Sequence, residues 1–566
     1  MSPPVVYGWR FWVVLFFLIA GFLALAGRLI DLAVFNRDFL VKQGQMRALR
    51  VVAIPAYRGM ILDRNNQPLA ISTPVDSVWV NPAQFHPGEN QIDSLAKILQ
   101  MPESDIKLLI ASQPTRNFIY LKRGNSPDIS EQISALKIPG IYFQREYKRF
   151  YPEAEVTSHL VGLTNVDDRG QEGLELAYDQ WLAGKPGKKQ VIKDRLGNII
   201  SELALLQKPE QGHDLVLSID KRIQYSAYQA LKAAVTQYQA ESGSVVVLDA
   251  RTGEVLAMVN QPSFNPNNRP KQHDGRYRNR AVTDMYEPGS TLKTFTLALA
   301  LASGKYTPNT IIDTRPGWMN VGGYRITDDD DFGVISLKEV LAMSSNIGAT
   351  KIMMSLSPQD HWKLLHAAGF GELTGSGFPG EAAGRLAHES IWRPSEIATL
   401  AYGYGLAVTT LQLAHAYSIF ANGGVLRPLS LLRVSNPPAG TQVISPVIAN
   451  KMLGLLENDV ADGKWHTGTR AQIPGYRVGG KTGTSYIAGP HGYDHHKYNS
   501  SFVGIAPLSN PRLVIAVYLR DPHGSHMGAM VSAPVFAQVM SESLRILNVF
   551  PDQQAQTANT NNSQNN

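Results

Sequence analysis

The tetrapeptide Lys481-Thr482-Gly483-Thr484 occurs once in this chain of 566 residues and constrains its fold more than any other feature. Two shorter motifs precede it, Ser290-Thr291-Leu292-Lys293 and Ser344-Ser345-Asn346. A serine acyl-transfer site of this type requires the order SxxK, SxN, KTG, so the fold must bring three distant segments together. The single KTG favours these copies over the other SxxK and SxN serines, which are Ser94, Ser104, Ser134, Ser218, Ser263 and Ser563.

Ser290 stands at the predicted start of a buried helix. Pro288 and Gly289 end the preceding segment, and an apolar run follows at residues 292–302. Lys293 then lies one turn further along the same helix face. The ordinary alternative is a helix-capping serine beside a solvated lysine, and the presence of the other two motifs disfavours it.

Ser344-Ser345-Asn346 lies near the predicted end of a short helix. Ser336 and Glu339 form a capping-box pattern, and apolar positions follow them. Polar side chains at a helix end can face a cleft. Without the other two motifs, these residues would be interpreted as ordinary end-of-helix polar residues.

The KTG motif is predicted to form an edge strand. It follows Val478-Gly479-Gly480 and precedes strand-like runs at residues 502–505 and 513–519. Glycines in an edge strand let the backbone of a ligand approach closely. The alternative for this segment is a glycine-rich turn.

The residue types in the three motifs indicate how a serine could be activated. A serine hydroxyl is a poor nucleophile until a nearby base takes its proton. The three motifs contain no histidine, so Lys293 is the candidate base. A free lysine has a pKa of about 10.4, so burial and a neighbouring cation must lower that value. Lys481 is the candidate cation.

The remaining motif residues are predicted to relay protons and bind substrate. Ser344 is a candidate proton relay, and Asn346 a candidate hydrogen-bond partner for a substrate amide. The amides of Ser290 and Thr484 could form an oxyanion hole, and the side chains of Lys481, Thr482 and Thr484 could meet a substrate carboxylate. The order of proton transfers stays open. The predicted catalytic residues are Ser290, Lys293, Ser344, Asn346 and Lys481, and the predicted substrate-binding residues are Thr482, Gly483, Thr484 and Ser485.

With these motifs the chain resembles the class B penicillin-binding proteins, and most closely their division-specific transpeptidases in Gram-negative bacteria. The resemblance runs from about Arg58 to Leu547. It includes Arg58-Gly59-Met60-Ile61-Leu62-Asp63-Arg64, Arg149-Phe150-Tyr151-Pro152, His159-Leu160-Val161-Gly162, Gln171-Glu172-Gly173-Leu174-Glu175, Lys193-Asp194-Arg195, Arg278-Asn279-Arg280 and Tyr402-Gly403-Tyr404-Gly405-Leu406.

The resemblance implies a mixed α/β architecture and a specific reaction. The fold would combine an αβα penicillin-binding domain with a mainly antiparallel sheet, an elongated mixed pedestal and one N-terminal transmembrane helix. Ser290 would be acylated by the penultimate D-alanine of a peptidoglycan stem peptide, and an amine of a neighbouring stem would complete the cross-link. β-Lactams would trap Ser290. No cofactor, metal or nucleic acid is implied; the implied partners are the lipid-linked precursor polymer and division-complex proteins, including a glycosyltransferase.

Residues 11–27 form an uncharged, mostly apolar run that favours an uncleaved membrane anchor over a signal peptide. We expect an anchor at residues 11–30 after a cytoplasmic tail at residues 1–10. Basic residues are more numerous after the run than before it, and counting them would place the large domain in the cytoplasm. The family instead implies a single pass through the bacterial inner membrane, a periplasmic catalytic domain and a place at the division septum.

The rest of the chain is expected to form two domains and a tail. A pedestal would take residues 31–212, with Arg58, Asp63, Arg149 and Glu172 as candidates for structural salt bridges. The transpeptidase domain would take residues 213–549. Residues 550–566 are rich in Asn, Gln and Thr and should be disordered.

Several features favour less specific interpretations. Asp328 begins a run of four acidic residues, expected to be a solvated loop. A loop is expected at residues 487–500, where His491, His495 and His496 match no trusted metal-ligand spacing. The absence of cysteine excludes disulfides and Cys-ligated metals, and the net charge of +6 comes with no basic helix that would indicate nucleic-acid binding.

Three other functions stay open at this stage. An elongation-specific class B transpeptidase would carry the same motifs. A D,D-carboxypeptidase or β-lactamase would use water in place of the acceptor amine. A scaffold would recruit division partners through its anchor and pedestal while the site stayed idle.

Overall fold

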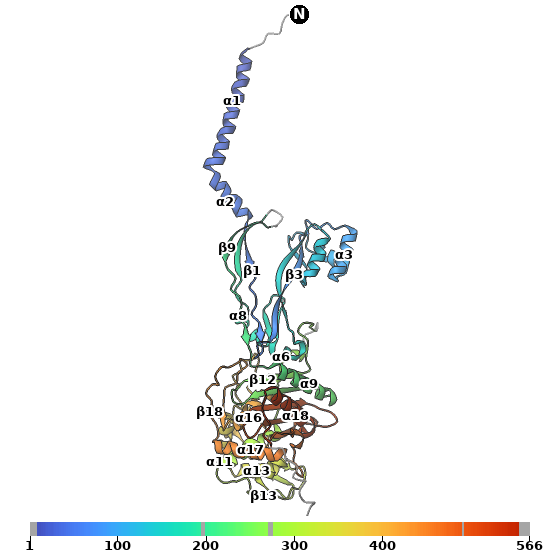
Figure 1. Ribbon diagram of the computed structural model, residues 1–566, viewed down its shortest axis with the longest axis vertical. Coiled ribbons are helices and arrows are strands. Elements are labelled where there is room, and N and C mark those ends of the chain that lie inside the picture. The colour runs from blue at the N-terminus through green and yellow to red at the C-terminus, as the bar shows by residue number, and fades with distance from the viewer. Residues whose placement is uncertain (1–7, 194–198, 270–274, 490–491, 554–566) are drawn as a thin grey trace, which may run out of the picture. The chain divides into compact units, whose positions relative to one another are not determined.

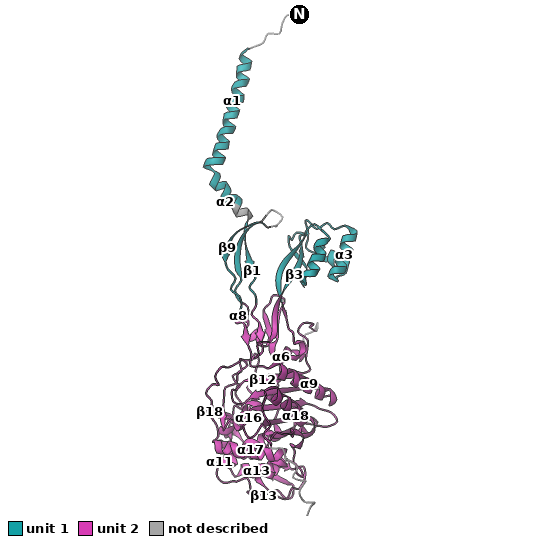
Figure 2. Ribbon diagram, in the orientation of Figure 1, with its two compact units in different colours: residues 1–57, 74–148, 184–212 teal, residues 58–73, 149–183, 213–566 magenta. Residues whose placement is uncertain are grey.

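The computed structural model describes residues 8–193, 199–269, 275–489 and 492–553, which form two compact units (Figure 2). The first unit comprises residues 1–57, 74–148 and 184–212, and the second comprises residues 58–73, 149–183 and 213–566. The chain passes from one unit to the other along β3 (Pro68–Val80) and β5 (Ile141–Phe150). Most of the tail predicted to be disordered lies outside the described residues.

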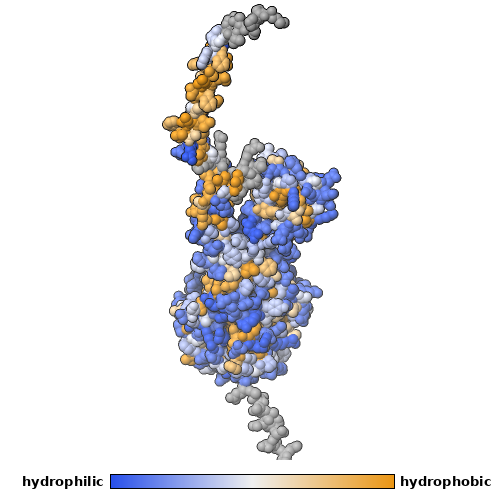
Figure 3. Space-filling view, turned by 45° about the horizontal axis from the view of Figure 1, so that its top comes forward, coloured by the Kyte–Doolittle hydropathy of each residue, from blue (hydrophilic) through white to orange (hydrophobic). Residues whose placement is uncertain are grey.

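The first unit begins with an apolar helix. α1 (Gly8–Ile30) continues through a π-helical turn (Asp31–Phe35), and the two together are 28 residues long. None of the side chains in α1 is buried, and hydrophobic residues cover the face of it seen in Figure 3. At about 1.5 Å per residue the helix exceeds the roughly 30 Å of a bilayer core. This helix is consistent with a single-pass membrane anchor.

The remainder of the first unit mixes strands and helices. After α2 (Arg37–Ala48), β1 pairs with β8 and β8 with β9 in an antiparallel sheet. Three helices pack with β4 around a separate core that includes Leu95, Leu99, Ile106 and Ile133. The bounds are β1 Leu49–Ile54, α3 Glu89–Leu99, α4 Glu103–Ala111, β4 Ile119–Asn125, α5 Pro127–Ala135, β8 Gly187–Lys193 and β9 Ile199–Gln207.

The second unit is built on a five-stranded antiparallel sheet with the order β12-β11-β21-β20-β19. Its edge strand β12 is labelled in Figure 1. Successive residues of a strand face opposite sides of a sheet, and β11 shows the consequence. Val245 and Val247 belong to one buried cluster, while Val246 and Leu248 belong to another. The bounds are β11 Ser242–Asp249, β12 Val255–Gln261, β19 Gly479–Gly489, β20 Gly492–Ala506 and β21 Leu513–Arg520.

Helices cover both faces of this sheet, which makes the predicted αβα arrangement. α9 (Lys221–Gln237) and α18 (Gly528–Ile546) contribute to one cluster, and α11 (Lys293–Ala302), α16 (Thr410–Ala421) and α17 (Pro446–Val460) to the other. The predicted fold class is confirmed. Further helices are α12 Leu337–Ala342, α13 Asn346–Met354, α14 Pro358–Ala367 and α15 Pro394–Leu400. Two small antiparallel sheets pair β13 Ile311–Asp313 with β16 Val334–Ser336 and β14 Trp318–Val321 with β15 Tyr324–Thr327.

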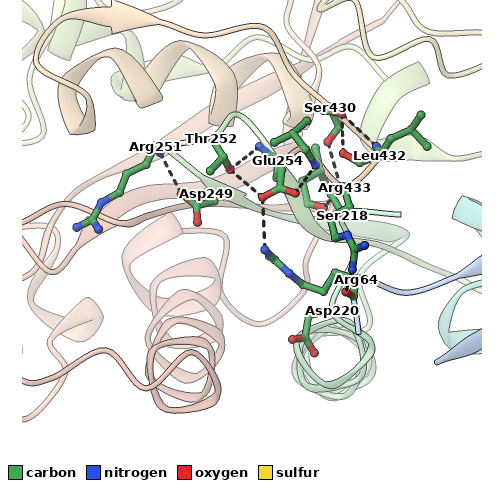
Figure 4. A network of polar contacts seen from close by, with 12 residues as sticks. Arg64, Ser218, Asp220, Asp249, Arg251, Thr252, Glu254, Ser430, Leu432 and Arg433 are labelled. Carbon is green, nitrogen blue, oxygen red and sulfur yellow. Dashed lines mark hydrogen bonds and ion pairs between the residues drawn. The ribbon is translucent and has the colours of Figure 1, made fainter. Parts of the chain in front are cut away.

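The polar network in Figure 4 connects Arg64, in the segment of residues 58–73, with Glu254 and Arg433 in the rest of the second unit. Arg64 Nη2 lies 3.4 Å from the Glu254 carboxylate. Arg433 donates to the Arg64 carbonyl at 3.0 Å, and the backbone N–H of Val434 donates to Glu254 at 3.0 Å. Strand β2 (Ile61–Leu62) also pairs in parallel with β10 (Leu215–Val216). This early segment is therefore an integral part of the second unit.

A buried ion-pair cluster lies beside this segment. The Arg58 and Arg149 guanidinium groups both contact the Glu175 carboxylate, at 2.7 and 2.6 Å, and all three side chains are at most 1% exposed. Arg58 also contacts Asp179 at 2.7 Å. Arg58 and Arg149 thus form ion pairs as predicted, with Glu175 as their shared partner. Asp63 accepts hydrogen bonds from backbone N–H groups of its own turn.

The domain boundaries predicted at residues 212 and 549 stay predictions. The first unit ends at Gly212, but it excludes residues 58–73 and 149–183, which pack with the second unit. The pedestal expected from the sequence is thus distributed over both units.

Replacing Glu175 with Gln should destabilise the second unit, because two buried arginines lose their shared counter-charge. We expect a loss of about 3–5 kcal/mol in the free energy of unfolding, measured by urea denaturation of the solubilised protein. Glu542→Gln is the control, because Glu542 forms an exposed pair with Arg545 and should change the midpoint little. Equal midpoints for the two variants would contradict the prediction.

Candidate active site

Ser290 lies in a 3₁₀ turn, Gly289–Leu292, that leads directly into α11. Gly289 has a φ of +56°, and a Cβ at this position would come within 2.8 Å of the Thr484 carbonyl oxygen. Gly403 packs on the same turn, where a Cβ would meet the Gly289 carbonyl oxygen at 2.0 Å. Ser290 therefore lies in a turn whose close packing requires glycine at positions 289 and 403.

Lys293 is the first residue of α11 and is fully buried. Its Nζ lies 2.8 Å from Ser290 Oγ, 3.1 Å from Ser344 Oγ and 2.7 Å from Asn346 Oδ1. It also donates to the backbone carbonyl of Ser344. One nitrogen thus brings the SxxK and SxN motifs together.

Ser344 occupies the junction between α12 and α13 with a left-handed φ of +62°, a conformation that costs a non-glycine residue about 1–3 kcal/mol. Asp328 holds the start of α13 in place. Its carboxylate accepts hydrogen bonds from the Ser345 hydroxyl at 2.6 Å and from the backbone N–H groups of Asn346 and Ile347 at 2.5 and 3.0 Å. The prediction of a solvated acidic loop is wrong for Asp328, whereas the three acids after it are exposed.

Lys481 lies on the edge strand β19 and is also fully buried. Its Nζ donates to Thr467 Oγ1 at 2.8 Å, to Thr482 Oγ1 at 3.2 Å and to Asp459 Oδ1 at 3.3 Å. The KTG lysine is therefore anchored from behind by α17, which carries Asp459, and by the segment containing Thr467.

Strand β19 passes very close to the Ser290 turn. A Cβ at Gly483 would come within 2.6 Å of the Pro288 carbonyl oxygen and within 2.3 Å of Ser501 Oγ. Such contacts are too short for any side chain, so the glycine of KTG is required by packing. This close approach brings the Thr484 backbone next to the turn that carries the nucleophile.

Burial and a neighbouring positive charge change the acid–base equilibrium of Lys293. Burial, together with the positive charge of Lys481, lowers the pKa of Lys293 to about 7. The carboxylates of Asp328, Asp329 and Asp459 oppose this lowering. A substantial fraction of Lys293 is therefore neutral near pH 7 and can accept a proton.

A cleft of about 320 Å³ opens above these groups. Lys293 and Lys481 are buried, and Gly483 packs against the Ser290 turn. The predicted site residues that line the cleft are Ser290, Ser344, Asn346, Thr482, Thr484 and Ser485, and other lining residues include Thr467, Tyr402, Tyr404, Tyr486, Tyr498 and His526.

The loop expected at residues 487–500 is instead the outer part of a hairpin. β19 continues to Gly489 and β20 begins at Gly492, with Tyr486 directly opposite Tyr498. The two rings lie 5.1 Å apart, and both line the cleft. Cross-strand aromatic pairs of this kind favour continued strand pairing. His495 and His496 lie on β20, and His491 falls outside the described residues.

Three site residues were missed from the sequence: Asp328, Asp459 and Thr467. Of these three, only Asp459 has a sequence context that could have indicated a buried role. It follows Met452, Leu455 and Leu456 at helical spacing on the buried face of α17. A carboxylate on an apolar helix face indicates a buried partner, although it does not identify Lys481.

Comparisons with known proteins agree with this geometry. A family model of the penicillin-binding protein transpeptidase domain matches residues 243–541, and one of the penicillin-binding protein dimerisation domain matches residues 53–217. The chain belongs to the penicillin-binding proteins that combine a dimerisation domain with a transpeptidase domain. The family predicted from the sequence is thereby confirmed, and the transpeptidase domain contains all three motifs of this penicillin-binding protein.

Relatives and solved structures cover most of this penicillin-binding protein. The probable peptidoglycan D,D-transpeptidase PbpC of Pseudomonas aeruginosa is 42% identical over 96% of both chains, and the peptidoglycan D,D-transpeptidase FtsI of Escherichia coli K12 is 39% identical over 96% of this chain and 93% of its own. The apo transpeptidase domain of Burkholderia pseudomallei penicillin-binding protein 3 is 45% identical, with a TM-score of 0.55, and covers 60% of this chain and 98% of its own. Penicillin-binding protein 3 of Mycobacterium tuberculosis complexed with aztreonam is 27% identical, with a TM-score of 0.70, and the match covers 89% of this chain and 98% of its own.

Gly483→Ala should impair acylation of Ser290, because the new methyl group must displace the strand or the serine turn. Overpacking costs about 1–3 kcal/mol, so we expect the rate of reaction with a labelled penicillin to fall roughly 10-fold or more. Gly454→Ala is the matched control, since its Cβ would meet nothing within 4 Å. If both variants react at the wild-type rate, the packing argument is wrong.

Proposed function

We propose that this protein is a serine D,D-transpeptidase that cross-links peptidoglycan stem peptides through an acyl-enzyme on Ser290 during septal wall synthesis. The observation that carries the proposal is the position of Lys293 Nζ, within 3.1 Å of side-chain oxygens of Ser290, Ser344 and Asn346. That nitrogen can take the nucleophile's proton and can pass it to Ser344.

Acylation begins with neutral Lys293, which takes the proton of the Ser290 hydroxyl. Ser290 Oγ then attacks the carbonyl carbon of the penultimate D-alanine, and the amides of Ser290 and Thr484 receive the developing oxyanion. The peptide C–N bond breaks, and the leaving D-alanine nitrogen takes a proton relayed from Lys293 through Ser344. An ester on Ser290 and free D-alanine result.

Deacylation reverses the direction of proton transfer. An amine of a neighbouring stem attacks the ester carbonyl and gives up a proton through Ser344 and Lys293, and Ser290 Oγ leaves with a proton. The new amide bond is the cross-link, and the hydroxyl is regenerated. A β-lactam would follow the first step and remain attached to Ser290.

The substrate carboxylate is bound at β19. Thr482 and Thr484 line the cleft, and the Thr484 hydroxyl can donate to the carboxylate, whereas the Thr482 hydroxyl already donates to Thr467 Oγ1 and the Lys481 ammonium is buried. Lys481 acts mainly through its charge, because its N–H groups already contact Thr467, Thr482 and Asp459. Asn346, with its Nδ2 held by the Thr327 carbonyl, sits at the cleft wall beside the substrate amide.

The cellular setting follows from the anchor and the family. We propose that the apolar helix holds the protein in the bacterial inner membrane with the catalytic unit in the periplasm at the division septum. Its partners there are division-complex proteins, including a glycosyltransferase that makes the glycan strands. The similarity to the relative named FtsI supports the division-related part of this proposal.

The acyl-enzyme can be tested with a labelled penicillin and identification of the modified residue after digestion. We expect the label on Ser290 and none on Ser290→Ala. The rate should rise with pH through about 7, because Lys293 must lose its proton before it can accept that of Ser290. Label on any other residue would overturn the assignment.

The second step can be tested by adding an acceptor amine to the acyl-enzyme formed with a stem-peptide substrate. A transpeptidase should give the cross-linked product. Release of free acid at the same rate with and without the amine would indicate a hydrolase instead.

The septal role predicts that a fluorescent fusion collects at midcell during division. Ser290→Ala should impair growth while leaving that position unchanged, since the anchor is intact. A sidewall pattern would support the elongation-specific alternative, and unimpaired growth would support the scaffold.

A further inference from the structure

Asp459 is a buried carboxylate that the proposed acyl-transfer steps do not use. It is the penultimate residue of α17 and has no exposed surface. A helix C-terminus carries a partial negative charge, so this is an unfavourable position for an anion. Burial of an uncompensated charge adds to that cost. A carboxylate kept here needs a partner of opposite charge, and Lys481 is that partner.

A chain of hydrogen bonds connects Asp459 to the cleft. The Thr482 hydroxyl donates to Thr467 Oγ1 at 2.9 Å, and the Thr467 hydroxyl donates to Asp459 Oδ1 at 3.0 Å. Thr467 Oγ1 also accepts from Lys481 Nζ. Both threonines line the cleft. The orientation of their O–H bonds therefore depends on the Asp459 carboxylate, which is the last acceptor in this series of hydrogen bonds.

Packing keeps Asp459 in this orientation. A Cβ at Gly468 would come within 2.5 Å of Asp459 Oδ2, so the backbone of the Thr467 segment closes over the carboxylate. Oδ2 has no hydrogen-bond partner among the described residues, while Oδ1 receives both the Thr467 hydroxyl and the Lys481 ammonium. Among the described residues, the Asp459 carboxylate therefore accepts side-chain hydrogen bonds from Thr467 and Lys481.

We propose that Asp459 is a positioning residue that holds Lys481 and Thr467 in place and sets the pH range over which the acyl-transfer site works. The inference rests on the proposed roles of Ser290 and Lys293. Asp459 acts through Lys481 and Thr467 and does not itself touch the substrate.

Charged groups on the elements packed around Asp459 affect the pKa values of Lys293 and Lys481. Lys293 lies on α11, Lys481 on β19, Asp328 and Asp329 precede α12, and His466 precedes Thr467. Burial lowers the pKa of both lysines, and the Asp459 carboxylate opposes that lowering in each case. Asp459 is the one acid of this group that also contacts Lys481 directly.

The protonation states of the two lysines determine how the pH profile of acylation should move when the charge of Asp459 is removed. The site needs Lys293 neutral and Lys481 charged, so the acidic limb of the pH profile follows the pKa of Lys293 and the alkaline limb follows the pKa of Lys481. Removing the negative charge of Asp459 makes both ammonium forms less stable and lowers both pKa values. Both limbs of the pH profile should therefore move to lower pH.

The test compares Asp459→Asn with the wild-type protein in the labelled-penicillin reaction across the acidic and alkaline limbs. We expect the optimum to fall by about one pH unit, the lower end of the effect of a nearby opposite charge. Glu457→Gln is the matched control: it removes the same charge from the same helix, but Glu457 is partly exposed and pairs with Arg477. Its optimum should stay at the wild-type value.

Two results would overturn the proposal: an unmoved optimum in Asp459→Asn, or a rate lowered equally at every pH, as expected for a purely structural residue. If Asp459→Asn does not fold, Thr467→Val decides. Thr467→Val keeps the charge of Asp459 but removes a hydrogen-bond acceptor from the Lys481 ammonium. We therefore expect only the alkaline limb of the pH profile to move to lower pH. An unchanged profile would count against the proposal. Failure of the wild-type protein to label Ser290 would instead refute the proposed function.

Discussion

The site depends on two lysine ammonium groups buried within one small region. Neither Lys293 nor Lys481 has exposed surface, and like charges in a medium of low dielectric constant repel strongly. The protein resolves this conflict in two ways. Burial and the charge of Lys481 lower the pKa of Lys293 to about 7, while the Asp459 carboxylate opposes the lowering that burial imposes on the pKa of Lys481. One lysine can then serve as a base because the other remains a cation.

Close backbone packing makes this arrangement possible. The Ser290 turn and the KTG strand approach within distances that only Gly289 and Gly483 permit. A wider gap would admit water and weaken the electrostatic effect of Lys481 on Lys293. The glycines therefore contribute to the chemistry indirectly, because they keep the two lysines in a shared buried environment.

The sequence predicted the features that local patterns specify. The motifs, α11 and the edge strand were all recognisable, because turn residues and apolar spacing act over a few positions. Asp328 and Asp459 were not assigned to the site, because their partners lie 18 and 22 residues away along the chain and meet them only through tertiary packing. The prediction of a loop at residues 487–500 was wrong, because the pairing of β19 with β20 continues past Tyr486 and Tyr498.

The contact between Asp459 and Lys481 is itself fixed by one helix–strand crossing. A Cβ at Gly479 would meet Leu456 Cβ at 3.0 Å, so α17 lies directly on β19 at that glycine. Three residues along the helix, about 4.5 Å, lead to Asp459, and two residues along the strand, about 6.6 Å, lead to Lys481. Both steps return to the same face of their element. The ion pair is thus a geometric consequence of the crossing, and a side chain at Gly479 would require α17 and β19 to move apart by a few tenths of an ångström without altering either charge.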